Sequence, residues 1–367
     1  MILVLNCGSQ SIKWKVFTSP AEALAKAGQN LILIKKGARE VLNSDNYEKL
    51  LEEELNKISI KGISIIGHRV VHGGKKFISS IKITEENLLE LEKLNHLAPL
   101  HNPYNILGIK TCQKIFQGIP QFAVFDTEFF KDLPEKAYTY ALPKDISEKF
   151  GFRRYGFHGI SHEFVASAAA KAMADKEKAG GKNFKKLKII TCHLGGGASI
   201  TAIKNGKAID TSMGFTPLEG LVMMTRPGNI DAGIVLELAK EFSIDKAREI
   251  LNKESGVKGI CGEEEMLKVL EILKMNKPAF AGASARQRKS KLAMDVFIYS
   301  IQKYIGAYYT ILGGCDILVF TGAIGFGSEK IRKMIRKDLN ILKTAKILAI
   351  ETDEELSIAE KVLNIKY

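Results

Sequence analysis

The sequence predicts an α/β protein built from two similar domains with a central cleft between them. Its length of 367 residues is more than one ordinary hydrophobic core organises. Apolar strand-like runs alternate with amphipathic helix-like segments along the chain. A unit of strand, small polar turn and strand occurs twice, at residues 1–17 and 187–203. A repeated unit of this kind indicates a duplicated fold.

The first of these units opens the chain. Residues 1–5 are apolar, residues 12–17 alternate between apolar and polar, and the six residues between them are small and polar. We expect two strands joined at a tip whose N–H groups, hydroxyls and amide can bind phosphate. Taken alone, the tip favours an ordinary edge hairpin, because polar turns are common.

Periodicity predicts the remaining elements. The expected strands cover residues 30–35, 63–71, 122–127, 187–192, 200–203, 315–321 and 346–351. The expected helices cover residues 47–57, 85–94, 232–242, 266–275, 285–312 and 354–363. A further helix is expected in the alanine-rich stretch that ends near residue 178. Asn205-Gly206 predicts a tight hairpin turn, Gly180-Gly181 a flexible connection, and residues 97–103 a loop. Residues 210–231 lack a regular pattern, which is typical of a functional segment.

Composition is that of a soluble globular protein, with 46% apolar and 26% charged residues. No apolar run reaches the ~18 residues that a membrane span needs, and the N-terminus does not resemble a signal sequence. Five dispersed cysteines without CxxC spacing indicate free thiols in a reducing cytoplasm. The net charge of +13 is spread along the chain, so we expect a generally basic surface and no nucleic-acid or membrane partner.

Charged residues follow two of the predicted strands. Arg69 lies near the end of residues 63–71, and Asp126 lies near the end of residues 122–127. Open α/β sheets bind their ligands at the carboxyl ends of the strands, so these side chains are candidates for a site. As isolated residues they have structural alternatives, since an arginine can form a surface ion pair and an aspartate can cap a turn.

Eight co-linear strings resemble the acetate kinase family of the acetate and sugar kinase/Hsp70/actin superfamily. They are NCGSQSIKWKVF, GHRVVHGG, LAPLHNP, VFDTEFF, RRYGFHGISH, DTSMGFTPLEGL, DILVFTGAIG and ETDEELSIA. The resemblance implies two duplicated ribonuclease H-like (actin-like ATPase) domains. Residues 1–147 with 354–367 would form the first, and residues 148–353 the second. It also implies a homodimer.

The reaction implied by the resemblance is reversible phosphoryl transfer from ATP to acetate. The acceptor carboxylate is already ionised at neutral pH, so the site needs cations that bring two anions together rather than a strong base. The resemblance places Arg69 and Arg226 around the carboxylate and the phosphoryl group, His158 as a donor to the phosphoryl oxygens, and Asp126 where it positions substrate and metal. We expect the two guanidinium groups, one from each half of the chain, to converge on one spot.

The resemblance also assigns binding residues. The acetate pocket would be lined by Arg69, Val71, Leu100, His101, Phe157 and Pro217. The nucleotide phosphates would be bound by Ser9, Ser11, Lys13, His193, Gly195, Gly197, Ile324 and Gly325. Mg²⁺ or Mn²⁺ would be held near Asn6 and Glu354, although Glu354 could equally be a helix N-terminal charge.

This chain departs from the family pattern in two places. Gly196 replaces the usual asparagine of the second phosphate loop. The adenosine region reads Glu265-Met266-Leu267 and Ala323-Ile324-Gly325-Phe326-Gly327, without the usual arginine. These departures leave two alternatives to an ATP-dependent acetate kinase. One is a short-chain carboxylate kinase with another phosphoryl donor, such as pyrophosphate, and the other is a nucleotide-binding regulatory protein without turnover.

Overall fold

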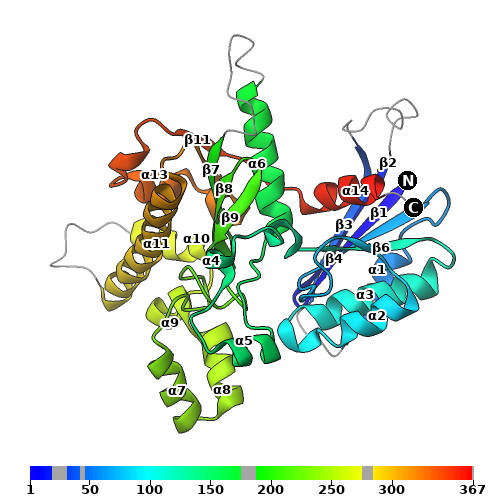
Figure 1. Cartoon of the computed structure of the whole chain (residues 1–367), viewed down its shortest axis with the longest axis horizontal. Helices are drawn as coiled ribbons and strands as arrows, with labels where there is room; N and C mark the ends of the chain where they lie inside the picture. The colour runs from blue at the N-terminus through cyan, green and yellow to red at the C-terminus, as the bar shows by residue number, and fades with distance from the viewer. Residues whose placement is uncertain (19–30, 42–45, 175–186, 275–283, 366–367) are drawn as a thin grey trace. The chain divides into compact units, whose positions relative to one another are not determined.

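The computed structural model describes residues 1–18, 31–41, 46–174, 187–274 and 284–365. The chain forms two compact units (Figure 1). The first unit comprises residues 1–131, 159–164 and 353–367, and the second comprises residues 132–158 and 165–352. Each unit contains one β-sheet and its own helices.

The sheet of the first unit has six strands in the order β3-β2-β1-β4-β6-β5. The strands are β1 (Ile2–Gly8), β2 (Ser11–Thr18), β3 (Ile32–Glu40), β4 (Ile65–Val70), β5 (Ile81–Lys82) and β6 (Gln121–Phe125). The first three are antiparallel neighbours, and β4 and β6 run parallel to β1. The predicted hairpin is confirmed, with strands that extend further into the polar stretch than expected.

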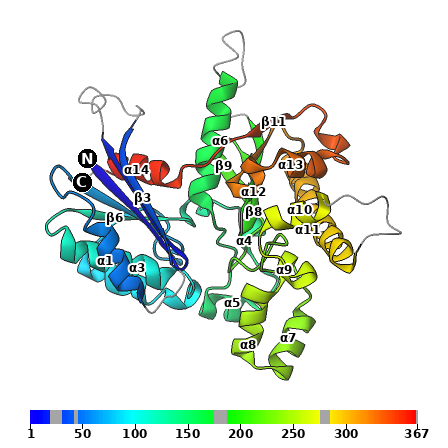
Figure 2. The same cartoon turned by 180° about the vertical axis from the view of Figure 1, so that it is seen from behind.

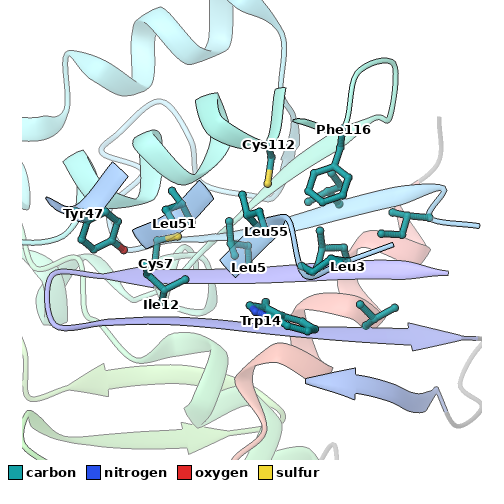
Figure 3. Packing of buried hydrophobic residues seen from close by; sticks show 14 of the residues in the cluster. Leu3, Leu5, Cys7, Ile12, Trp14, Tyr47, Leu51, Leu55, Cys112 and Phe116 are labelled. Atoms are coloured by element: carbon teal, nitrogen blue, oxygen red, sulfur yellow. The ribbon is translucent and has the colours of Figure 1, made fainter. Parts of the chain in front are cut away.

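Both faces of this sheet are covered by helices, as the alternation along β1 requires. Leu3 and Leu5 pack with residues of α1 (Tyr47–Leu55) and α3 (Asn102–Ile115), and Figure 3 shows them against Trp14 of β2. Ile2 and Val4 point to the other face and pack with α14 (Glu354–Asn364). A third cluster gathers around α2 (Glu85–Glu92).

The sheet of the second unit repeats this topology. Its order is β11-β10-β7-β8-β9, formed by β7 (Lys188–Leu194), β8 (Ala198–Lys204), β9 (Lys207–Thr211), β10 (Ile317–Thr321) and β11 (Lys346–Ala349). Again three antiparallel strands precede two parallel ones, so β9-β8-β7-β10-β11 matches β3-β2-β1-β4-β6. Asn205 adopts a left-handed conformation (φ 57°) in the predicted Asn-Gly turn. The duplicated fold is therefore confirmed by strand order.

The longest helix of the second unit is α11 (Ala285–Leu312), as predicted. Ser284 and Gln287 form a capping box at its start, and Gly313 ends it at φ 66°. α11 packs against β7 and β8. It also packs against α9 (Gly256–Cys261) and α10 (Met266–Lys274), which lie beside it in Figure 2. The remaining helices are α4 (Glu135–Tyr138), α5 (Lys144–Phe150), α6 (Gly159–Ala174), α7 (Ala232–Glu241), α8 (Ile244–Glu249), α12 (Gly322–Gly327) and α13 (Glu329–Arg336).

Several predicted elements need correction. Residues 97–103 are not only a loop, because a 3-10 turn covers Asn95–Leu97 and α3 begins at Asn102. Pro103 fits the first turn of α3, where no N–H is needed. The third strand is Ile32–Glu40, which is shifted toward the C-terminus and longer than expected. The expected glycine connection at 180–181 and the predicted helix beyond residue 174 lie outside the described residues.

The division into compact units differs from the predicted domain boundaries. Residues 132–147 belong to the second unit, where α4 contacts β9. Residues 159–164 belong to the first unit, where the Gly159 N–H donates to the Asp126 carbonyl (2.9 Å) and Ile160 joins the core beneath α14.

None of the helices within the described residues is long and apolar enough to span a membrane.

Candidate functional site

In the first unit, a cluster of charges surrounds Arg69 of β4. The Arg69 guanidinium donates to both carboxylate oxygens of Asp126, at 3.1 Å from Nε to Oδ1 and 2.6 Å from Nη2 to Oδ2. Asp126 directly follows β6, and its N–H donates to the Val70 carbonyl (3.0 Å), which aligns the ends of β4 and β6. Arg69 Nη1 also lies 3.2 Å from Glu354 Oε2. The structure therefore brings Arg69, Asp126 and Glu354 together within the first unit.

Burial sets the electrostatics of this cluster. The Asp126 side chain is only 2% exposed. Burial raises the pKa of the Asp126 carboxyl above its ordinary value, although the Arg69 guanidinium opposes this shift. Burial also acts to lower the pKa of Arg69, but Asp126 and Glu354 outweigh it and raise that pKa. Arg69 is thus a permanent cation whose charge is largely compensated by carboxylates.

Asn6 lies at the same guanidinium. Its Oδ1 accepts from Arg69 Nη1 (3.3 Å), and its Nδ2 donates to Glu355 Oε1 (3.1 Å). Glu355 and Lys15, which contacts Glu355, were missed by sequence reasoning. The alternation of β2 was the available signal, because it places Lys15 on the same face of the sheet as Lys13 and α14.

The donors around Arg69 are suited to a hard cation. Among the described residues, no three His, Cys, Asp or Glu side chains form a ready metal-binding group. Asn6 Oδ1 and the carboxylates of Asp126 and Glu354 instead share one guanidinium. Mg²⁺ is held by one or two carboxylates together with waters and substrate phosphates, so these oxygen donors fit it in chemistry.

Two buried asparagines of α3 fix the loop that follows β4. Asn105 Oδ1 accepts from the Val71 N–H (3.0 Å), and Asn105 Nδ2 donates to the Cys7 carbonyl (2.6 Å). Asn102 Oδ1 accepts from the His72 N–H (3.1 Å), and its Nδ2 donates to the His72 carbonyl (3.0 Å). Sequence reasoning missed both, because it did not predict a helix after His101. Asn105 thus ties the end of β4, which carries Arg69, to the last residues of β1.

In the second unit, His158 is held in an unusual backbone conformation. It is one of three described non-glycine residues with positive φ (59°). Its Nδ1 lies 2.8 Å from Ser199 Oγ of β8, and its ring stacks on the ring of His193 with centroids 4.3 Å apart. A Cβ placed on Gly197 would lie 3.5 Å from His158 Nε2 and 3.9 Å from Arg226 Nη1. His158 and Arg226 therefore lie next to Gly197, and His193 is stacked on His158.

Arg226 differs from Arg69 in its partners. The only hydrogen bond that its side chain forms among the described residues is a weak one, from Nη1 to the Pro217 carbonyl (3.4 Å). No carboxylate of the described residues forms an ion pair with it, and burial lowers its pKa. A half-buried guanidinium without a counter-ion is a place for an anion to bind.

The irregular segment that carries Arg226 is held by a partly buried cluster around Arg154, called the clamp below. Arg154 Nη2 donates to Glu219 Oε1 (2.6 Å), and Arg154 Nη1 donates to the carbonyls of Thr211 and Ser212. Tyr140 donates from its hydroxyl to Glu219, while that hydroxyl accepts from the Phe215 N–H. The prediction that residues 210–231 are irregular is confirmed between β9 and α7, and the clamp explains how such a segment is positioned.

The other predicted residues are distributed over both units. Ser9 and Ser11 lie at the β1–β2 turn, and Lys13 is exposed on β2. Val71, Leu100 and His101 belong to the first unit, whereas Phe157 and Pro217 belong to the second. Because these five residues are divided between the two units, the acetate pocket stays a prediction.

The departing residues of the adenosine region lie at two helices of the second unit, whereas Gly196 lies in the loop between β7 and β8. Met266 is buried at the start of α10, while Glu265 and Leu267 are exposed. In α12, Ile324 is buried next to β7, and Phe326 is 39% exposed. A Cβ placed on Gly327 would have no atom within 4 Å, so this end of α12 is open.

Comparison with known proteins gives consistent results over the whole chain. Residues 1–364 match the model of the acetokinase family. Acetate kinase of Carboxydothermus hydrogenoformans is 41% identical, over 99% of this chain and 98% of the relative. Acetate kinase 2 of Clostridium perfringens is also 41% identical, over 99% and 92%.

Solved structures agree with this result. Acetate kinase of Porphyromonas gingivalis superposes with a TM-score of 0.82 at 34% identity, covering 99% of both chains. A propionate kinase from Francisella tularensis superposes with a TM-score of 0.82 at 35% identity, covering 98% of both chains. The two sheets of matching strand order are thus the two ribonuclease H-like halves of an actin-like ATPase fold.

Proposed function

Because the chain belongs to the acetokinase family, we propose that it catalyses reversible phosphoryl transfer from ATP to acetate, giving acetyl phosphate and ADP. Relatives named acetate kinase align over 99% of the chain, which favours this reaction over another donor or a protein without turnover. The observation that carries the proposal is the uncompensated positive charge of the Arg226 guanidinium. This guanidinium has no carboxylate partner in the described residues, yet it lies at the same glycine loop as His158.

Arg226 and His158 stabilise the transferring phosphoryl group in this proposal. Charge spreads over the equatorial oxygens in the transition state, and an uncompensated guanidinium neutralises it. In this proposal the Ser199 hydroxyl, 2.8 Å from His158 Nδ1, donates to that nitrogen, and His158 carries its proton on Nε2. His158 Nε2–H then donates to a phosphoryl oxygen. Gly197 has no side chain, so the phosphate approaches the backbone closely.

Arg69 has a different role, because its charge is compensated. Asp126 fixes the guanidinium plane through three hydrogen bonds. We assign Arg69 to the acetate carboxylate, which it orients for in-line attack. Magnesium bound through Asp126, Glu354 and Asn6 would supply charge neutralisation for the nucleotide phosphates. Ser9, Ser11 and Lys13 of the first unit, and His193, Gly195, Ile324 and Gly325 of the second, bind those phosphates in this proposal.

The acyl pocket sets the choice of acid. Val71, Leu100, Phe157 and Pro217 give it apolar walls that suit a methyl group. One methylene group discriminates by only ~1–3 kcal/mol, so propionate is a slower substrate rather than an excluded one. A relative of similar fold is named a propionate kinase, which is consistent with a small change in this pocket.

A hydroxylamine trap tests the function. The purified protein is incubated with acetate, Mg²⁺ and hydroxylamine, and ATP, GTP or pyrophosphate is supplied in turn. We expect acetohydroxamate with ATP, and less product with propionate as acceptor. Product with pyrophosphate and none with ATP would contradict the donor assignment, and no product with any donor would contradict the enzyme assignment.

We also propose that the protein is a cytoplasmic homodimer. None of the residues of α7 is buried, although its sequence is mostly apolar. Ile234, Leu236, Phe242 and Ile244 of α7 and the following residues are 50–70% exposed. An isolated short helix is marginal in water, so a second copy covering this face would stabilise it. Sedimentation should give a dimer for the wild type and a monomer for Leu236→Glu; a monomeric wild type contradicts the proposal.

The cytoplasmic assignment is supported by the thiols and by the co-substrate. All five cysteines are free, and four of them are buried. ATP and a reducing environment are both found in the cytoplasm. Cell fractionation should recover the protein with soluble cytoplasmic markers, and recovery outside the cytoplasm contradicts the assignment.

A further inference from the structure

Lys15 links β2 to the start of α14 and belongs to none of the roles assigned above. Its Nζ lies 2.8 Å from Asp353 Oδ1 and 3.2 Å from Glu355 Oε2. Asp353 is the N-cap of α14, and the same Oδ1 accepts from the Leu356 N–H (2.8 Å). One ammonium group therefore binds both the cap and the first turn of the helix.

The contacts continue from Lys15 to the predicted metal donors. Glu355 accepts from Asn6 Nδ2, so the Asn6 amide is oriented with Oδ1 toward Arg69. A carboxylate can only accept hydrogen bonds, which is why Glu355 fixes this orientation rather than the reverse one. Glu354, the neighbour of Glu355 on α14, contacts Arg69. The position of the helix start thus sets two of the three oxygen donors.

The balance of charge explains why a cation is needed at this point. Asp126, Asp353, Glu354 and Glu355 bring four negative charges, and within the cluster Arg69 neutralises only part of them. Burial acts to lower the pKa of Lys15, but Asp353 and Glu355 outweigh it and raise that pKa. Lys15 stays protonated and compensates the two carboxylates that do not face Arg69.

We propose that Lys15 is a positioning residue for the divalent cation of this reaction. It holds the first turn of α14 on β2, keeps Glu355 on Asn6, and thereby presents Asn6 Oδ1 and the Glu354 carboxylate to the metal. The proposal rests on the proposed function. Partners of this kind, which orient metal ligands without touching the metal, typically change metal affinity 10–100-fold when they are removed.

The chain offers a matched control at the other end of the same helix. Lys361 Nζ lies 2.8 Å from Glu163 Oε2 and 3.3 Å from Glu128 Oε1. Its side chain is 20% exposed, which matches the 21% of Lys15. Lys361→Met therefore removes a comparable pair of ion pairs from α14 without touching the first turn. If Lys15 has a purely structural role, Lys15→Met and Lys361→Met should have the same effect on stability and on metal binding.

The test compares Lys15→Met, Lys15→Arg, Asp353→Asn and Lys361→Met. Asparagine caps a helix as well as aspartate does, so Asp353→Asn removes the ion pair and keeps the cap. Binding of Mn²⁺ in the presence of ADP is followed by electron paramagnetic resonance, and the Mg²⁺ concentration that gives half-maximal rate is measured with acetate. Hydrogen exchange is measured at the Leu356 and Ser357 amides of the first turn.

We expect Lys15→Met to weaken Mn²⁺ binding and to raise the half-maximal Mg²⁺ concentration by about tenfold or more. Asp353→Asn should act in the same direction, by about threefold or more, and Lys15→Arg should stay within about threefold of the wild type. First-turn exchange should accelerate in Lys15→Met and not in Lys361→Met. Lys361→Met should lower the melting temperature and leave Mn²⁺ affinity unchanged.

Two results would overturn the proposal. Unchanged Mn²⁺ affinity in Lys15→Met, with a melting temperature lowered as in Lys361→Met, would show a structural ion pair only. Tighter Mn²⁺ binding in Lys15→Met would show that the ammonium only repels the cation. If the wild type makes no acetyl phosphate, the proposed function fails, while Mn²⁺ binding and hydrogen exchange still decide the role of Lys15.

Discussion

Replacing Arg226 by alanine should abolish most turnover and leave the fold intact. The guanidinium has one weak hydrogen bond and no carboxylate partner among the described residues, so its removal leaves no buried charge unpaired. Burial already lowers its pKa, which means that the free protein bears a desolvation cost for this charge. We therefore expect a melting temperature equal to or above that of the wild type.

The loss of rate can be worked from Coulomb's law. A unit positive charge about 4 Å from a unit of phosphoryl charge contributes about 4 kcal/mol at an effective dielectric constant near 20. That energy corresponds to about a thousandfold in rate, the lower end of the ~10³–10⁵ that arginines supply in phosphoryl transfer. Arg226→Ala should thus lower kcat about a thousandfold or more. Arg226→Lys should recover part of it, because charge remains but the forked donor is lost.

The assay is hydroxamate formation at saturating ATP and acetate, with thermal unfolding measured on the same samples. Arg153→Ala is the control, since the Arg153 guanidinium stacks 3.9 Å from the Tyr138 ring centroid in the same unit. We expect near-normal turnover for the control. A loss of less than tenfold in Arg226→Ala, or a loss that accompanies unfolding, would refute the assignment.

Three further predictions concern the fold around the site. Gly197→Ala should lower kcat/KM by about tenfold or more, because the new Cβ would lie next to His158 and Arg226. Gly196→Ala should be near normal in the same assay, because no atom lies within 4 Å of its Cβ. Arg154→Met should cost about 3–5 kcal/mol in urea unfolding, because it leaves the Glu219 carboxylate and two carbonyls without their donor; a cost below about 1 kcal/mol contradicts the clamp. Burial lowers the pKa of His68 to about 4, so the unfolded state binds the extra proton between pH 4 and 6.5 and stability should fall as pH falls through that window, by up to about 3 kcal/mol. Urea unfolding of the wild type and His68→Asn at pH 7 and pH 5 should show a smaller pH dependence in the variant, and equal slopes would rule out His68 as the cause.

Most strands were accessible from the sequence because the alternation of apolar residues follows directly from the pleat. The repeated strand–turn–strand unit predicted the duplication, and the sheet orders β3-β2-β1-β4-β6 and β9-β8-β7-β10-β11 confirm it. Helix α11 was predicted at its observed bounds from its periodicity, and the structure shows Ser284 and Gly313 as the caps at those bounds. Local signals of this kind do not depend on the rest of the chain.

Helix α3 was missed for a physical reason. Its first turn contains a proline and two asparagines, which are typical of loops. Asn102 and Asn105 are nevertheless buried and satisfied by the backbone of the loop after β4. Such partners are far away in sequence, so no local pattern predicts them.

The site was predicted unevenly for the same reason. Arg69 and Asp126 could be paired from the sequence, since parallel strands end at one edge of a sheet. Lys15 and Glu355 could not, because their contact joins opposite ends of the chain through the docking of α14 on β2. Ser199 was missed because only the positive φ of His158 turns its ring toward β8.

Arg69 and Arg226 are proposed to act together on one pair of reacting anions. A crystal structure with ADP, Mg²⁺, aluminium fluoride and acetate tests this proposal without an intermediate assumption. We expect both guanidinium groups within about 3.2 Å of the fluoride or acetate atoms, which is hydrogen-bond distance. A closed complex in which either guanidinium contacts neither anion would contradict the shared role of the two arginines.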